Sequence, residues 1–321
     1  LGHIWNVPFI EGKNCGGAFV LIYLLCILII GIPIMMAEIM LGRRGRQSPI
    51  NSMRTLATEA KASRYWSWLG WLGVIAGFLI LSYYSVIAGW AMAYVVRVAS
   101  GVFEGATADG VSHIFATFVA DPEKLLAWHS LFMIVTMLVV ARGVKGLERP
   151  VEFLMPALLA ILILLVGYAM ERGAFEEGVS FLFKADFTKM TSEGVLTAMG
   201  HAFFTLSLGM GAIMVYGSYL PSKVSIGSTT MLIGLADTVV ALLAGLAIFP
   251  IVFANSMEPA SGPGLIFQTL PIAFGQMAYG SIFGTLFFLF IVFAAWSSSI
   301  SLIYQDFARL VENKKMCAIR S

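Results

Sequence analysis

Oxygen-bearing side chains inside long apolar stretches are the residues of this sequence that could bind an ion. Asp237 lies in the segment 234–239, and it is the only charged residue between Lys223 and Glu258. A carboxylate near the middle of a membrane costs about 2.5–3.5 kcal/mol on insertion scales, so something must compensate it. His201 or a capping hydroxyl could do so. We favour a bound cation, because no Lys or Arg shares the apolar core with Asp237.

Hydroxyl groups interrupt two other apolar stretches. Ser297, Ser298 and Ser299 are consecutive, and Tyr84 follows Tyr83 in an earlier stretch. Serine hydroxyls in a membrane helix often donate to a carbonyl one turn back, and a tyrosine pair often serves only for packing. Three consecutive serines cannot all face lipid, however, and a phenol in the middle of a membrane needs a hydrogen-bond partner. Sites built only from oxygen are typical of a hard cation such as Na⁺.

Two glycines mark a weak point in the stretch that precedes Asp237. Gly209 and Gly211 follow Thr205 and Ser207 closely, and glycine costs about 1 kcal/mol relative to alanine inside a helix. Such a segment is either a packing surface between helices or a break that exposes carbonyls to an ion or substrate. Glu38, near the end of the first long apolar stretch, is expected to hydrogen-bond a neighbouring helix.

The composition is that of a membrane protein. Of 321 residues, 59% are apolar and 12% are charged, whereas soluble domains carry about 25% charged residues. The net charge of +2 gives no indication of nucleic-acid binding. Three scattered cysteines argue against a disulfide framework or a zinc site. No Gly-x-Ser-x-Gly elbow supports a hydrolase, so we expect no enzymatic activity.

Charge-poor stretches predict seven membrane-spanning helices, since a span needs about 20 apolar residues. Leu1–Ile10 is too short to span and is expected to be the outer half of a further helix, with both ends of the chain cut away. The connecting segments 173–194 and 255–276 are long and partly apolar, so we expect short lid-like helices there. The seven stretches lie between residues 13 and 43, 64 and 97, 124 and 142, 152 and 171, 193 and 223, 223 and 258, and 258 and 306.

Basic residues gather in alternate loops. The loop 42–65, the loop 142–149 and the tail after residue 308 are basic, whereas the loops between them carry mainly Asp and Glu. Basic loops stay in the cytoplasm. We therefore expect a multi-pass protein of the bacterial inner membrane, with the 42–65 loop and the C-terminus cytoplasmic.

Several motifs, in this order, resemble the neurotransmitter:sodium symporter family and its bacterial amino-acid transporter branch. They are Leu1–Pro8, Asn14–Phe19, Gly31–Pro33 followed by Glu38, Ser82–Tyr84, Ala202–Gly211, the Asp237 segment and Ala294–Ser299. The match runs from Leu1 to about Glu312. It implies an all-α, polytopic transmembrane helix bundle of the LeuT type, an inverted-repeat transporter fold with discontinuous helices 1 and 6. Residues 1–313 would form one transporter domain and residues 314–321 a cytoplasmic tail.

The resemblance also implies roles for matching residues. The substrate pocket would be lined by Ile80, Tyr84, Phe204, Thr205, Ser207, Gly209, Met210 and Ser298. A first sodium ion would be bound by His3, Thr205 and Asp237, and a second by the Ala294 carbonyl with Ser297 and Ser298. The gates would be Asn6 and Phe204 on the outer side and Tyr219 and Glu312 on the inner side.

The implied function is sodium-coupled import of an apolar or aromatic amino acid by alternating access. Chloride-dependent members have a neutral Asn where this chain has Asp237, so the carboxylate predicts chloride independence. The family has Asn in place of His3 and Arg in place of Asn6. The alternative is therefore a degenerate or binding-only member with altered ion coupling. The expected partners are the amino acid, sodium ions and the lipid bilayer, without nucleic acid.

Overall fold

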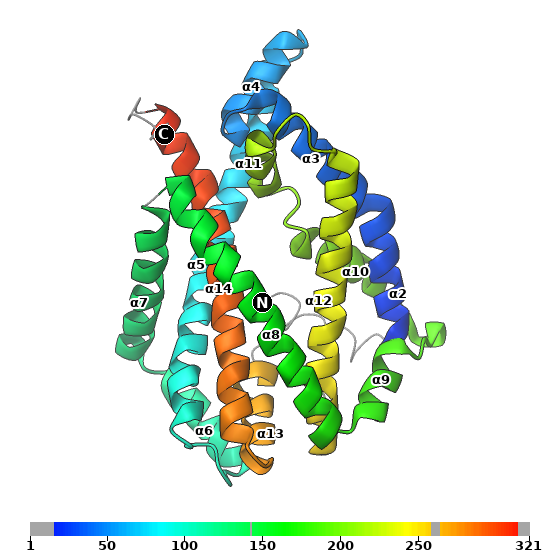
Figure 1. Ribbon diagram of the computed structural model, residues 1–321, viewed down its shortest axis with the longest axis vertical. Helices are drawn as coiled ribbons and strands as arrows, with labels where there is room; N and C mark the ends of the chain where they lie inside the picture. The colour runs from blue at the N-terminus through cyan, green and yellow to red at the C-terminus, as the bar shows by residue number, and fades with distance from the viewer. Residues whose placement is uncertain (1–15, 142, 258–263, 314–321) are drawn as a thin grey trace.

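The computed structural model describes residues 16–141, 143–257 and 264–313 (Figure 1). Within these residues every regular element is a helix, and an isolated bridge pairs Gly16 with Ala185. The expected all-α bundle is confirmed.

The elements follow one another through three long stretches of chain. The first holds α2 (Gly17–Cys26), the π-helix η1 (Ile27–Gly31), α3 (Ile32–Gly45), α4 (Pro49–Glu59), the 3₁₀ turn η2 (Arg64–Trp66) and α5 (Ser67–Ala99). Next come α6 (Ala108–Val119), α7 (Pro122–Val140), α8 (Gly143–Arg172), α9 (Phe175–Phe183) and η3 (Phe187–Lys189). The last holds α10 (Ser192–Thr205), α11 (Ala212–Tyr219), α12 (Ile226–Ala254), the π-helix η4 (Leu265–Thr269), α13 (Leu270–Gln276) and α14 (Gly280–Asn313).

Six helices among the described residues are long and apolar enough to cross a membrane. They lie at Gly17–Gly45, Arg64–Ala99, Pro122–Val140, Glu152–Arg172, Ile226–Ala254 and Gly280–Ile303. The seventh predicted span is divided into α10 and α11, with Leu206–Gly211 between them. The charge-poor stretches therefore predicted the helices correctly, and the glycine pair marked the one that is interrupted.

Large apolar side chains cover the outside of the bundle, as lipid contact requires. Leu28, Phe78 and Leu232 have exposed fractions of 57%, 62% and 67%. A soluble protein rarely leaves so many large apolar residues exposed, because their burial stabilises the fold. Side chains cap helix N-termini at the ends of the bundle by accepting hydrogen bonds from free backbone N–H groups. At the start of α7, for example, the Asp121 carboxylate accepts a hydrogen bond from the Lys124 amide.

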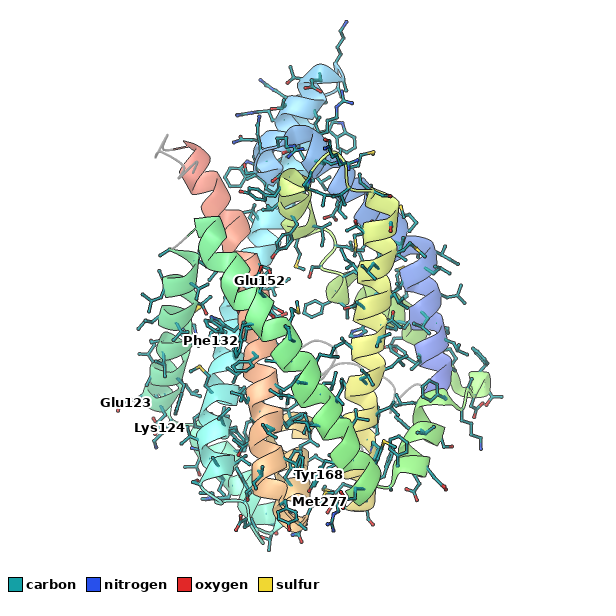
Figure 2. The ribbon with its side chains drawn as sticks, in the orientation of Figure 1. Glu123, Lys124, Phe132, Glu152, Tyr168 and Met277 are labelled. Carbon is teal, nitrogen blue, oxygen red and sulfur yellow. The ribbon has the colours of Figure 1, made fainter. Side chains whose placement is uncertain are left out.

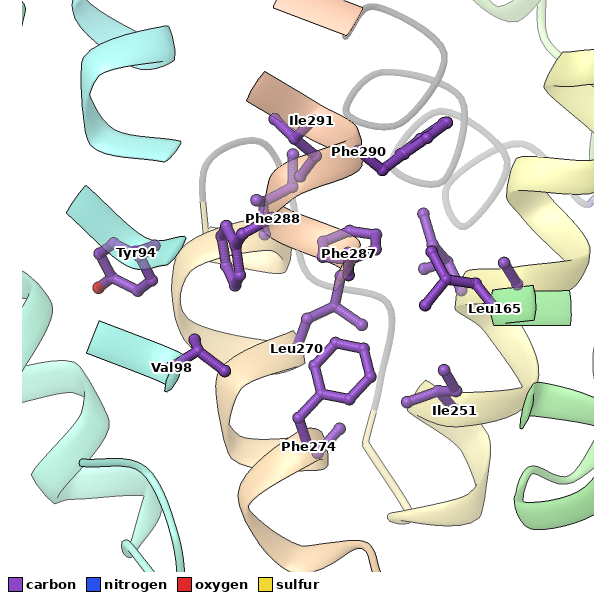
Figure 3. Packing of buried hydrophobic residues seen from close by; sticks show 14 of the residues in the cluster. Tyr94, Val98, Leu165, Ile251, Leu270, Phe274, Phe287, Phe288, Phe290 and Ile291 are labelled. Atoms are coloured by element: carbon purple, nitrogen blue, oxygen red, sulfur yellow. The ribbon is translucent and has the colours of Figure 1, made fainter. Parts of the chain in front are cut away.

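The main apolar core lies toward one end of the bundle, the end formed by α6 and α13, called here the α13 end (Figure 1). Its largest members are aromatic rings on six elements, and Figure 3 shows several of them packed around Leu270. The Tyr94 ring packs edge-on against Phe267 at 5.0 Å and at a tilt against Phe288 at 5.2 Å. Such ring pairs add stability beyond the apolar area that they bury.

Short helices at the α13 end were expected from the two long loops, and α9 and α13 confirm them. The Tyr168 hydroxyl of α8 donates to the Ala278 carbonyl just after α13, at 3.0 Å, and Figure 2 shows Tyr168 beside Met277. The Gly105 amide donates to the Gly275 carbonyl at 3.1 Å. These hydrogen bonds connect α13 and the residues after it to α8 and to the segment that follows α5.

Close glycine contacts join α3 to α11 at the opposite end, called here the α4 end (Figure 1). A Cβ atom built on Gly42 would lie 1.9 Å from the Met214 carbonyl oxygen, and one on Gly217 would lie 2.6 Å from the Ile39 oxygen. Neither position can carry a side chain, since real Cβ contacts are longer. The two helices therefore form a closely packed pair.

Candidate functional site

The interruption between α10 and α11 is a stretch of backbone with left-handed residues. Ser207, Gly209 and Gly211 have φ angles of 55°, 77° and 83°. Glycine adopts this conformation without a penalty, whereas Ser207 is strained in it. A helix broken in the apolar part of a membrane protein leaves backbone groups that need other partners. The discontinuous helix 6 that the sequence predicted is confirmed.

Two neighbouring helices hold this broken segment in place. Glu38 of α3 accepts a hydrogen bond from the Gly209 amide at 2.7 Å, with 9% of the residue exposed. On the other side, a Cβ atom on Gly73 of α5 would lie 2.9 Å from the Met210 carbonyl oxygen. Glu38 therefore has the structural role expected of it, and its partner is the broken helix itself.

A π-helical turn that the sequence did not reveal lies beside the break. The helix formed by α2 and α3 widens at η1, Ile27–Gly31, in a run of aliphatic residues. A Cβ atom on Gly31 would lie 2.6 Å from a Leu206 methyl carbon. Single π-turns inside α-helices occur frequently at functional sites.

Thr205 and Asp237 come together through a third residue, Tyr23. The Tyr23 hydroxyl donates to an Asp237 carboxylate oxygen at 3.3 Å and lies 3.3 Å from the Thr205 hydroxyl oxygen. The Tyr23 ring is 4% exposed and lies 5.2 Å from the His201 ring, centroid to centroid. Tyr23 stands in an apolar run, where its ring is the obvious feature, so sequence reasoning missed its hydroxyl. The cluster supplies carboxylate and hydroxyl oxygens from α2, α10 and α12.

The second candidate ion position lies on the unbroken helix α14. The hydroxyls of Ser297 and Ser298 both donate to the Ala294 carbonyl at 3.0 Å. A hydroxyl that gives its proton to the helix keeps its lone pairs for a cation. The Ala294 carbonyl already accepts two hydroxyl protons, so it can bind a cation only when a hydroxyl turns away. Ser299 is fully buried, and its hydroxyl has no hydrogen-bond partner in the described part of the chain.

Packing contacts place some of the candidate substrate residues, and the others are described by their exposure. Tyr84 is 6% exposed, packs with Ala295 and Phe132, and its hydroxyl interacts with that of Ser298. Met210 packs with Ile80 and Leu81 in a small apolar cluster. The structure thus brings the α5 candidates against α14 and against the break. The remaining candidates, Phe204, Thr205 and Ser207, are half-buried, and Gly209 is exposed.

Several expected gate and ion residues cannot be placed. His3 and Asn6 lie outside the described residues, as does the side chain of Glu312. Tyr219 ends α11 at the α4 end and is 52% exposed.

Oxygen atoms make up both candidate ion positions. In the part of the chain that the structure describes, no group of three His, Cys, Asp or Glu side chains could hold a metal ion. Hydroxyl and carbonyl oxygens with a single carboxylate suit a weakly held hard cation better than a transition metal. The donor set therefore fits Na⁺ as a transported ion.

The sequence and the fold match those of known proteins. A family model described as the sodium:neurotransmitter symporter family matches residues 1–105 and 119–319. An uncharacterized sodium-dependent transporter of Bacillus subtilis, YhdH, is 41% identical over 304 residues, which cover 94% of this chain and 66% of that protein. An uncharacterized sodium-dependent transporter of Haemophilus influenzae is 34% identical, with 98% and 71% covered. The chain spans about two thirds of the length of these curated relatives.

A solved structure shares the fold. The crystal structure of MhsT in complex with L-phenylalanine superimposes with a TM-score of 0.88 and 41% sequence identity, covering 98% of this chain and 71% of MhsT. The expected transporter fold is thereby confirmed.

Proposed function

Because the chain belongs to the sodium:neurotransmitter symporter family, we propose that it imports an apolar or aromatic amino acid together with sodium by alternating access. Its transporter domain comprises residues 1–313. The relatives are transporters named as sodium-dependent, in agreement with sodium as the expected coupled ion and with the expected lack of enzymatic activity. With its apolar spans, the chain is a multi-pass membrane protein.

The observation that carries the proposal is the link between Asp237 and the broken helix. Tyr23 joins the Asp237 carboxylate to Thr205, the last residue of α10 before the break. A cation bound by Thr205 and Asp237 therefore sits where α10 ends and the backbone carbonyls become free. A substrate carboxylate bound at this break would share the cation, which couples the two binding events.

The pocket residues support an apolar side chain on the substrate. Ile80 and Met210 pack together, and Phe204, just before the break, is half-buried. Tyr84 offers a hydroxyl for the substrate carboxylate, close to Ser298. The relative MhsT was crystallised with L-phenylalanine, an amino acid of this class.

Asp237 also supports transport that is independent of chloride. The carboxylate supplies the negative charge that chloride provides in members with Asn at this position. The basic 42–65 loop supports an orientation in which the α4 end faces the cytoplasm, since such loops are retained there. The extracellular side would then be the α13 end, closed by α9 and α13.

Proteoliposomes that contain the full-length protein provide the test. We expect an inward sodium gradient to drive accumulation of labelled phenylalanine or another apolar amino acid, with the same rate when gluconate replaces chloride. Potassium in place of sodium is the control. Saturable amino-acid binding without accumulation would instead support the binding-only alternative, and a several-fold loss of uptake in gluconate would contradict chloride independence.

A further inference from the structure

A hydrogen bond between the side chains of Tyr216 and Ser301 joins two groups of helices at the α4 end. α11 belongs to one group, because it packs on α3 through the Gly42 and Gly217 contacts. Arg46 of the same group donates to the Ser218 carbonyl in the last turn of α11, and Arg43 donates to the Val224 carbonyl that follows the helix. These contacts make α3 and α11 one closely packed unit.

Helix α14 belongs to the other group. It packs along α5 over most of its length, with Ala295 against Tyr84 and Ala88. Its contact with α11 is much smaller. The hydroxyls of Tyr216 and Ser301 meet across this narrow contact at 2.5 Å.

The direction of this hydrogen bond follows from counting protons. A serine hydroxyl has one hydrogen, and Ser301 donates it to the Ser297 carbonyl at 3.1 Å. Ser301 therefore accepts from Tyr216. The order is Tyr216 hydroxyl to Ser301 hydroxyl to Ser297 carbonyl.

The series ends at the backbone carbonyl of Ser297, whose side chain belongs to the candidate ion position on α14. Ser297 in turn donates its own hydroxyl proton to the Ala294 carbonyl at 3.0 Å. Ser301 is one helical turn from Ser297, which is a proposed ligand of the second sodium ion. Ser297 therefore takes part in both features, because its carbonyl accepts from Ser301 and its hydroxyl is a proposed ligand of the ion.

We propose that Tyr216 is a positioning residue of the transport cycle, which holds α11 against α14 while the second sodium position is filled. This inference rests on the proposed function. Tyr216 is 43% exposed, so water can replace its partner when the two groups separate. Reciprocal coupling then follows: the bond favours sodium binding, and sodium favours the closed contact. Loss of sodium toward the α4 end accompanies release of Tyr216.

Cysteine labelling of the full-length protein tests the contact. Ile303 of α14 is partly buried beside Leu302 and Met210, near the contact. In a background with native cysteines replaced, Ile303→Cys reports opening through its reaction with a soluble maleimide. Removing one neutral hydrogen bond should raise the labelling rate about twofold to tenfold. We expect this for Tyr216→Phe and for Ser301→Ala, with no further increase in the double variant.

Matched variants separate the hydrogen bond from general loosening. Tyr65→Phe and Ser82→Ala remove hydroxyls from exposed positions and should leave the rate unchanged. Ser301→Thr keeps the hydroxyl and should label as slowly as the parent. Sodium should slow labelling in the parent and have a smaller effect in Tyr216→Phe.

Unchanged labelling in Tyr216→Phe, or additive effects in the double variant, would overturn the inference, and so would labelling of the parent that does not respond to sodium. Failure of the proposed function gives a different result. Sodium-driven uptake would then be absent from the parent protein. The labelling rates of Tyr216→Phe and Ser301→Ala relative to the parent would still report on the hydrogen bond.

Discussion

The two candidate ion positions differ in charge and in backbone. Around Asp237 a carboxylate lies at the end of a broken helix, where Tyr23 and Thr205 come from separate elements. Around Ala294 the oxygens are neutral, and all of them lie on a continuous helix that already satisfies their protons. We therefore expect the electrostatic contribution to sodium binding to be larger at the first position than at the second. At the second position, a serine hydroxyl must turn away from the Ala294 carbonyl before that carbonyl can bind sodium. The second position is therefore suited to releasing the ion.

The largest expected effect comes from removing the charge at the first position. Asp237→Ala should weaken sodium binding about 10- to 150-fold, because a contact to a charged group contributes about 1.5–3 kcal/mol. Sodium-dependent binding of a labelled amino acid to the solubilised protein measures it. Asp109→Ala removes an exposed carboxylate of α6 and should change nothing. Unchanged sodium affinity in Asp237→Ala would remove this residue from the site.

The support of the broken helix gives the next effect. Glu38→Ala leaves the Gly209 amide without its acceptor, which costs about 1–3 kcal/mol for a buried group. Thermal unfolding in detergent should occur several degrees lower. Glu59→Ala breaks an ion pair with Arg44 whose side chains are 52% and 72% exposed, and should have little effect. Equal melting temperatures for both variants would show that Glu38 does not hold the break.

The smallest effect is expected at Tyr23, which acts through its neighbours. Tyr23→Phe keeps the ring against His201 and removes the hydroxyl shared by Thr205 and Asp237. Sodium affinity should fall about twofold to tenfold, since a neutral hydrogen bond contributes about 0.5–1.5 kcal/mol. The same binding assay reports it, with Tyr279→Phe as the exposed control. A loss as large as that in Asp237→Ala would mean that Tyr23 itself binds the ion.

The sequence predicted the features that depend on composition and on local chain stiffness. Charge-poor stretches located the spans, and Gly209 with Gly211 marked the break, because glycine destabilises a helix wherever it stands. Glu38 was expected to bind another helix because a lone carboxylate in an apolar stretch needs a partner.

Features that depend on pairing between distant segments could not be predicted in this way. Tyr23 lies 182 residues from Thr205 and 214 from Asp237, and nothing in its own apolar run distinguishes it from a packing residue. The π-turn at Ile27–Gly31 consists of aliphatic residues with no local signal. The contact of Tyr216 with Ser301 likewise exists only once α11 and α14 are adjacent.

The dependence of amino-acid binding on sodium concentration tests most directly whether two unlike ion positions act together. The full-length protein should give a sigmoidal curve with a Hill coefficient above 1, since two sodium ions would bind with one substrate. Asp237→Ala and Ser297→Ala should each reduce the coefficient to about 1, with the larger loss of affinity in Asp237→Ala. A hyperbolic curve for the unmodified protein, or the same curve in all three proteins, would contradict the account.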